Sequence, residues 1–180
     1  LIMMYVWFAN SFVFYGLYLN SGNLGGSLHT NFVMQVVVEL PAIVLGAYLL
    51  DAIGRRVTLS GAACLGGVAC LSCTFLSESL HIKIAAISGK FGISALFACT
   101  YVYQAELFPT GVRNLAMGIC SGSSRIGGVI TPGVLLLSAI HSTLPLVIFG
   151  VSALVAGLLL VMLPETVGKP LPQSTEDCIG

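Results

Sequence analysis

The chain has 180 residues, of which 57% are hydrophobic and only 8% are charged, and its mean hydropathy is +1.00. A soluble domain carries about 25% charged residues, so the composition predicts an all-α protein that lies in a lipid bilayer. Seven basic and seven acidic residues give a net charge of zero, without the basic stripe that a nucleic-acid partner requires. Neither a cofactor nor a metal is indicated.

Six stretches are long and apolar enough to cross a bilayer, which takes about 20 residues. They lie at residues 1–19, 29–50, 57–77, 82–104, 114–138 and 144–163. We therefore expect a six-helix transmembrane bundle over residues 1–163, followed by an extended polar tail at 164–180. The first stretch is apolar from its first residue and has no cleavage signal after it, so we expect a spanning helix of a truncated chain rather than a signal peptide.

The loops at 51–56 and 105–113 and the tail are separated by even numbers of crossings, so they share one side of the membrane. That side carries Arg55, Arg56, Arg113 and Lys169, whereas the other side carries Lys83 alone. By the positive-inside rule the tail is expected to be cytoplasmic.

Three ionisable residues lie at bilayer depth: Glu39, Lys90 and Arg125. An arginine near the bilayer centre costs roughly 2.5–3.5 kcal/mol on insertion scales, so such residues are candidates for a functional site. The alternative is an ion pair that only fixes helix packing. Lys90 lies nearer the outer interface and can also extend toward it.

The surroundings of Arg125 favour a solute path. The flanking polar and helix-bending residues are Ser121, Ser123, Ser124, Gly127, Gly128, Thr131 and Pro132. A polar, bendable helix at mid-depth is typical of a transport path. Tyr101 and Tyr103 can stack on an organic cation, or they can form an interfacial aromatic belt.

A second charged set is expected at the cytoplasmic helix ends: Asp51, Arg55, Arg56, Glu106, Arg113 and Glu165. Acids and bases that pair across helix ends can close an inner gate. Each exposed pair contributes only about 0–1 kcal/mol, which suits a gate that opens and closes. The alternative is that the arginines only set the topology.

The six cysteines lie mostly in apolar runs. Cys70 and Cys73 have the spacing of metal ligands, but no histidine accompanies them, so helix packing is the favoured interpretation.

Three motifs carry a resemblance to a known family. Asp51–Arg56 (DAIGRR) resembles the D-x-x-G-R-R loop of the major facilitator superfamily, although Ala52 replaces the common arginine. Glu106–Gly118 resembles the E-x-x-P-x-x-x-R-x-x-A-x-G signature, and Pro164–Gly168 resembles the P-E-T-x-G tail. Together with SSRIGGVITP at 123–132, these segments are similar to the organic cation, organic anion and carnitine transporter family (solute carrier family 22).

That resemblance implies helices seven to twelve of a twelve-helix transporter in the plasma membrane, with the missing N-terminal six-helix half as a partner. The implied function is transport of small organic ions by alternating access, with a coupling ion as a further candidate partner. Substrate-binding candidates are Glu39, Lys90, Arg125, Tyr101 and Tyr103, and the cytoplasmic gate is the charged set named above.

The charge of the substrate stays open at this point. In the similar family, an arginine at the position of Arg125 is typical of anion and carnitine members, whereas Glu39 resembles the acid of cation and carnitine members. The anion members often carry a lysine just after the proline of helix eight, where this chain has Ile43. Glu39 as the counter-charge of Arg125 suits a zwitterion such as carnitine or an organic cation, with an organic anion transporter or a sugar-porter-like facilitator as alternatives.

Two other classes of function are less compatible with the sequence. An intramembrane serine protease needs Ser124 and His141 side by side, but 17 residues along a helix span about 25 Å. A channel needs rings of like charge, whereas the charges expected at the centre have mixed signs.

Overall fold

The computed structural model describes residues 1–21, 27–76 and 79–168. Its elements are α1 (Ile2–Leu19), α2 (Leu28–Ala52), α3 (Arg55–Phe75), α4 (Ser79–Leu107), α5 (Thr110–Leu135), the short 3-10 helix η2 (Leu136–Ala139) and α6 (Leu144–Val161). The six long helices agree with the six predicted stretches and confirm the all-α fold. The tail from residue 169 onward, with Lys169 and Cys178, lies outside the described residues.

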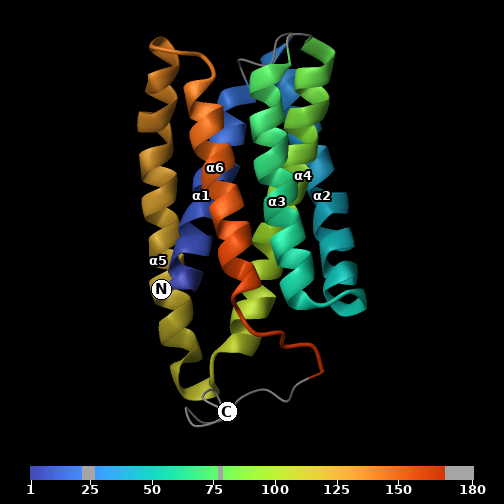
Figure 1. Cartoon of the computed structure of the whole chain (residues 1–180), viewed down its shortest axis with the longest axis vertical. Helices are drawn as coiled ribbons and strands as arrows, with labels where there is room; N and C mark the ends of the chain where they lie inside the picture. Colours follow the sequence, from blue (N-terminus) through green and yellow to red (C-terminus); the bar gives the residue numbers. More distant parts are fainter. Residues whose placement is uncertain (22–26, 77–78, 169–180) are drawn as a thin grey trace.

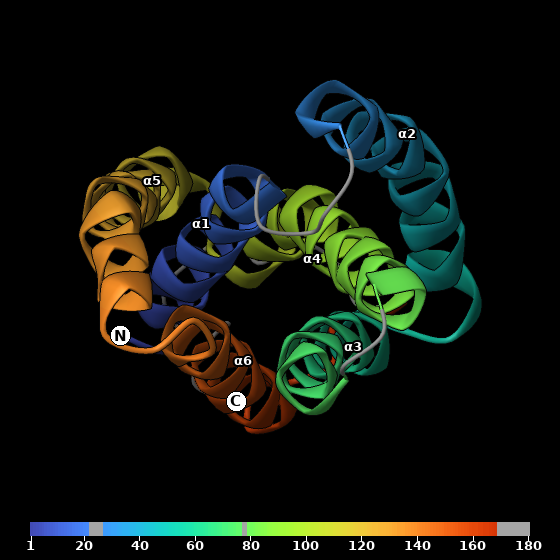
Figure 2. The same cartoon turned by 90° about the horizontal axis from the view of Figure 1, so that it is seen from above.

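The helices run alongside one another, and each reverses the direction of the one before (Figure 1). Seen from above, α1 and α4 lie in the middle, α3 and α6 close one side, and α5 and α2 flank the bundle at opposite ends (Figure 2). In agreement with this view, α5 packs mainly on α1, and α2 packs mainly on α4. The α2–α3 turn, the α4–α5 turn and the end of α6 meet at the same end of the bundle.

Five of the helices are long and apolar enough to cross a membrane: α1, α2, α3, α4 and α6. The fifth predicted span, α5, falls outside this group because its serines and its two arginines, Arg113 and Arg125, lower its hydropathy. That α5 crosses the membrane therefore stays a prediction.

The loop expected at 105–113 is shorter than the sequence suggests. Helix α4 continues to Leu107, and α5 already begins at Thr110. The break falls at Pro109, which lacks an N–H group and disfavours a helical conformation for the residue before it.

Small residues let the helices approach closely. A side chain at Gly127 would lie 2.5 Å from the Phe8 carbonyl oxygen, so this glycine brings α5 against α1. Gly67 on α3 and Gly150 on α6 face each other in the same way. The five described cysteines are free, and Cys99 lies against Gly46 where α4 meets α2. These contacts support the packing interpretation of the cysteines.

Candidate functional site

An ion pair joins two neighbouring helices, α2 and α4, near the middle of their lengths. Lys90 of α4 is fully buried, and its Nζ lies 3.7 Å from Oε2 of Glu39 on α2. Nζ makes no hydrogen bond with any residue in the described part of the chain. The Glu39 side chain remains 27% exposed, so the carboxylate is the accessible member of the pair. The sequence allowed Lys90 to extend toward the outer interface, but in the structure its side chain stays buried beside Glu39.

Helix α1 completes the environment of this pair. The Tyr18 hydroxyl donates a hydrogen bond of 2.7 Å to Glu39 Oε2. The Lys90 ammonium group lies 3.0 Å from the centroid of the Phe14 ring and 3.5 Å from that of the Tyr18 ring. A carboxylate and the negative faces of two aromatic rings thus offset the cost of burying a lysine.

The two rings belong to a longer aromatic strip, defined here as Trp7, Phe14, Tyr18, Phe32, Phe97 and Tyr101. Its closest pair is Trp7 and Tyr101, edge to face with centroids 4.5 Å apart. The strip joins α1, α2 and α4 beside the ion pair. Most of these residues were missed from the sequence, although residues 7, 14 and 18 share one face of a helix.

Tyr101 and Tyr103, which were both expected in the site, lie in different surroundings. Tyr101 is 41% exposed at the end of the strip. Tyr103 is buried, and its hydroxyl donates to the Pro164 carbonyl oxygen at 2.7 Å. Two residues along a helix correspond to a rotation of about 200°, so both rings cannot face one ligand. The contacts thus separate Tyr103 from Tyr101 in this structure, and a role of Tyr103 in substrate binding stays a prediction.

Arg125 lies on α5, away from the ion pair. Its side chain is exposed, and it forms no ion pair with any described residue. Glu39 is paired with Lys90 instead, because α1 and α4 lie between α5 and α2 (Figure 2). The expectation that Glu39 is the counter-charge of Arg125 is thus incorrect. The hydroxyls near Arg125 bond to backbone carbonyls: Ser124 to Ser121, and Thr131 to Gly127 and Phe12.

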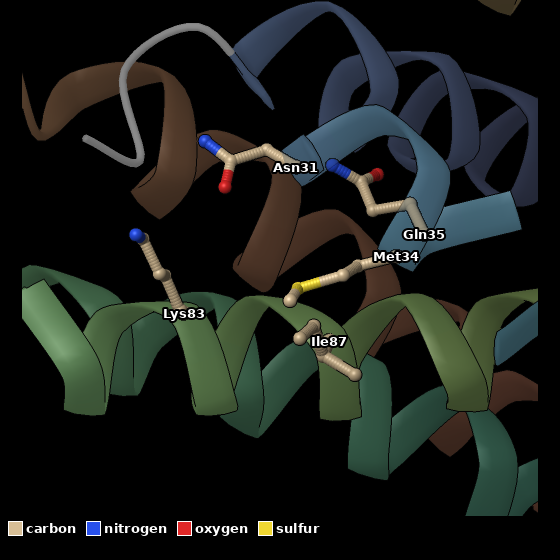
Figure 3. Close-up of a pocket in the computed structure, with 5 residues that line it drawn as sticks. All are labelled: Asn31, Met34, Gln35, Lys83 and Ile87. Atoms are coloured by element: carbon tan, nitrogen blue, oxygen red, sulfur yellow. The ribbon is translucent and has the colours of Figure 1, made fainter. Parts of the chain in front are cut away.

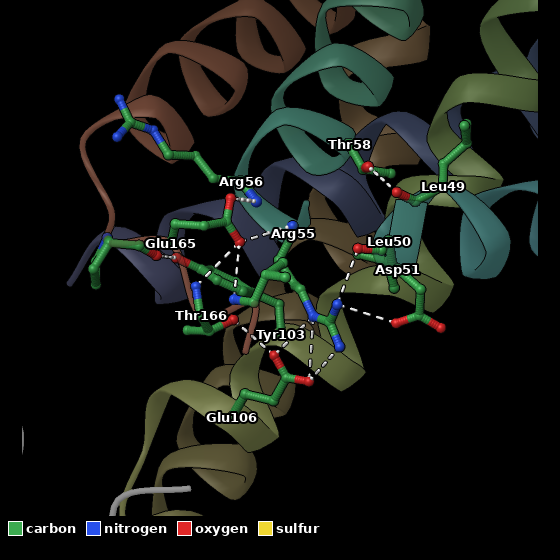
Figure 4. Close-up of polar contacts among 12 residues, drawn as sticks. Leu49, Leu50, Asp51, Arg55, Arg56, Thr58, Tyr103, Glu106, Glu165 and Thr166 are labelled. Atoms are coloured by element: carbon green, nitrogen blue, oxygen red, sulfur yellow. Dashed lines mark hydrogen bonds and ion pairs between the residues drawn. The ribbon is translucent and has the colours of Figure 1, made fainter. Parts of the chain in front are cut away.

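A second polar group, the inner clasp, lies where the α2–α3 turn, α4 and the residues after α6 meet (Figure 4). We define it as Asp51, Arg55, Tyr103, Glu106, Glu165 and Thr166. The Arg55 guanidinium group lies 3.1 Å from Glu106 Oε2 through Nε and 3.0 Å from Asp51 Oδ1 through Nη1. Nη1 also donates to the Leu50 carbonyl oxygen at 3.0 Å. Arg55 thereby joins three helix ends.

Glu165 caps the start of α3. Its carboxylate accepts hydrogen bonds from the backbone N–H groups of Arg55 at 2.9 Å and Arg56 at 3.0 Å, and from those of Thr166 and Val167. Burial acts to raise the pKa of the Glu165 carboxyl, but these four N–H groups together hold it below its usual range. Gly54 has a φ of 117°, and a side chain there would lie 3.0 Å from Glu165 Oε2. The glycine thus permits both the turn and the cap.

The clasp contains four of the six residues expected at the cytoplasmic gate. Arg56 takes part only through its backbone, and its guanidinium group points away from the cluster (Figure 4). Arg113 donates from Nε to the Phe108 carbonyl oxygen at 3.3 Å, within its own turn, and does not reach the acids. The Thr166 hydroxyl, missed from the sequence, donates to Glu106 at 2.7 Å.

Comparison with known proteins assigns the chain to a family. Residues 1–177 match the Major Facilitator Superfamily. The chain is 44% identical to solute carrier family 22 member 15 of Xenopus tropicalis, of which it covers 36%, and 40% identical to the organic cation transporter protein of Drosophila melanogaster, of which it covers 33%. All of this chain is aligned in the first case and 98% in the second. It therefore spans about a third of the length of these relatives.

A solved structure gives the same fold. The inward-open xylose transporter XylE from E. coli superposes with a TM-score of 0.73 over 92% of this chain and 48% of its own, at 18% identity. The chain belongs to the Major Facilitator Superfamily, and its sequence is of the solute carrier family 22 type. This membership confirms the resemblance found in the motifs, the integral membrane class and the expectation that the chain is no enzyme.

Proposed function

We propose that this chain forms the C-terminal six-helix half of a longer transporter that moves small organic cations or zwitterions across a membrane. The observation that carries the proposal is the Glu39–Lys90 pair beside the aromatic strip. Two further facts support it: a relative 40% identical to this chain is named an organic cation transporter protein, and the chain covers 48% of the xylose transporter structure that shares its fold.

The accessible charge at the centre favours a positive group on the substrate. Lys90 is fully buried, whereas Glu39 retains exposed surface and lies beside aromatic rings. Carboxylates and ring faces both attract quaternary ammonium groups. The arriving cation competes with Lys90 for Glu39, so the buried lysine balances the carboxylate while the site is empty.

Arg125 and Tyr101 extend the site for larger substrates. Both side chains are exposed, Arg125 on α5 and Tyr101 at the end of the strip. In our proposal Arg125 faces the space between the two halves and pairs with a negative group of a zwitterion such as carnitine. Organic anion transport is the second candidate, favoured by the exposed Arg125 and disfavoured by the accessible Glu39.

We further propose that the inner clasp serves alternating access. It joins the inner ends of α2, α3, α4 and α6, so this half can rock as one body against the other. Arg56 and Arg113, whose side chains lie outside the clasp, remain for contacts with the other half when the inner gate closes. The tail faces the cytoplasm, the membrane is the plasma membrane, and a coupling ion is a candidate partner.

Competition uptake tests the proposal. The full-length protein is expressed in cells, and uptake of a labelled quaternary ammonium ion is measured against an excess of an unlabelled cation, a zwitterion or an anion. We expect the cation and the zwitterion to compete more strongly than the anion. Uptake blocked only by the anion would support the second candidate instead.

A further inference from the structure

A separate pocket lies between the outer ends of α2 and α4, near the first residues of both helices. Its lining consists of Asn31, Met34 and Gln35 from α2 and Lys83 and Ile87 from α4 (Figure 3). The pocket is small, so it suits one small polar group rather than a whole organic ion. None of these residues belongs to the central pair, the aromatic strip or the inner clasp.

Gln35 is the feature that points to a ligand. Its side chain is only 2% exposed, yet neither its amide oxygen nor its amide nitrogen has a partner among the described residues. Nearly all buried side-chain amides in folded proteins are hydrogen-bonded, because an unpaired one loses its contacts with water and gains nothing. A hydrogen-bond acceptor bound in this pocket would give the Gln35 amide nitrogen a partner.

The lining selects the charge of that group. Lys83 contributes a positive charge and three N–H donors, and Gln35 contributes an NH2 donor. The Lys83 and Asn31 side chains extend into the same space from opposite helices (Figure 3). None of the five lining residues is acidic. This combination of donors and positive charge suits a small anionic group.

We propose that this pocket binds the carboxylate of a zwitterionic solute as it enters from the outer side. Gln35 and Glu39 are four residues apart, so they share a face of α2 about 6 Å apart along the axis. A carboxylate held at Lys83 and Gln35 thus leaves the cationic end of the same molecule one helical turn from Glu39. The identity of the solute rests on the proposed function, whereas an inorganic anion such as chloride has the same binding chemistry.

Uptake of a matched pair of probes tests this inference: a betaine-type zwitterion and its methyl ester, which lacks the negative charge. In the full-length protein, Lys83→Gln is expected to raise the KM for the zwitterion about tenfold, as the loss of one charged contact does. The KM for the ester should change less than about threefold. Gln35→Leu should also raise the ratio of the KM for the zwitterion to the KM for the ester. Lys83→Arg should leave this ratio at its wild-type value.

The outcomes separate the two sources of the anion. Equal changes for both probes, or no change for either, would overturn the pocket as an anion site if uptake is also unaffected by replacing chloride with gluconate. Chloride-dependent uptake of both probes that Lys83→Gln removes would assign the pocket to chloride rather than to the carboxylate.

Ligand binding keeps the test independent of transport. If the wild type transports neither probe, the proposed function fails, and thermal stabilisation of the purified full-length protein then decides on the pocket. The zwitterion should raise the unfolding temperature of the wild type more than that of Lys83→Gln. Equal stabilisation of the two proteins, or none of the wild type, would refute the carboxylate site.

Discussion

The cap that Glu165 forms on α3 gives a sharp prediction about stability. The Glu165 carboxylate accepts hydrogen bonds from the backbone N–H groups of Arg55 and Arg56 at 2.9 and 3.0 Å, and Glu165→Gln removes its negative charge. Loss of a helix cap costs about 0.5–2 kcal/mol. For a domain of 150–250 residues, each kcal/mol lowers the unfolding temperature by roughly 2–4 °C. Since the full-length relatives are about three times as long as this chain, and a longer chain shifts less per kcal/mol, we expect the midpoint of the full-length protein to fall by at most about 8 °C.

The assay is thermal unfolding of the purified full-length protein in detergent. Asp51→Asn is the matched control, because this carboxylate contacts Arg55 but is 79% exposed. An exposed pair contributes about 0–1 kcal/mol, so the control should lower the midpoint less than Glu165→Gln does. An unchanged midpoint for Glu165→Gln, or a larger loss for Asp51→Asn, would show that the cap does not hold the inner end together.

Three further predictions concern the pH dependence of this cap, the Glu39–Lys90 pair and the contact of α5 with α1. First, since the pKa of Glu165 is lowered, its stabilising effect is present above the ordinary glutamate pKa of 4.5 and is lost as the pH falls below it, so the midpoints of wild type and Glu165→Gln should converge in acid. Divergence in acid would reverse the sign we assign. Second, Lys90→Met should lower the free energy of unfolding by about 3–5 kcal/mol, because it leaves the Glu39 carboxylate without its counter-charge. Adding Glu39→Gln should recover much of this loss in thermal unfolding. Additive losses would mean that the two residues are not coupled. Third, Gly127→Val should destabilise the protein by about 1–3 kcal/mol by forcing α5 off α1, whereas Gly122→Ala, in open space, should not. Equal midpoints for these two variants would contradict the close packing.

The six helices were predictable because each apolar run is long enough to be recognised as a helix on its own, whatever packs beside it. The inner charged set was also predictable in part, because charges near helix ends collect on one side of a membrane. The role of Glu165 as a cap was not, because it depends on where the residues after α6 return to the start of α3. Sequence position alone does not show that return.

The partner of Glu39 could not be predicted from the sequence. Glu39, Lys90 and Arg125 all lie within predicted spans, but only the lateral order of the helices decides which two meet. The structure places α2 against α4 and α5 against α1, so Glu39 meets Lys90. The aromatic strip was missed for the same reason, since three helices contribute to it.

In our proposal Glu39, rather than Arg125, receives the positive group of the substrate. The most direct measurement is the half-saturation concentration for uptake of a tetraalkylammonium ion, which carries no negative group, by the full-length protein, corrected for the amount at the cell surface. We predict that Glu39→Gln raises this concentration at least about tenfold and that Arg125→Gln changes it less than about threefold. An unchanged value for Glu39→Gln together with a large rise for Arg125→Gln would contradict the account.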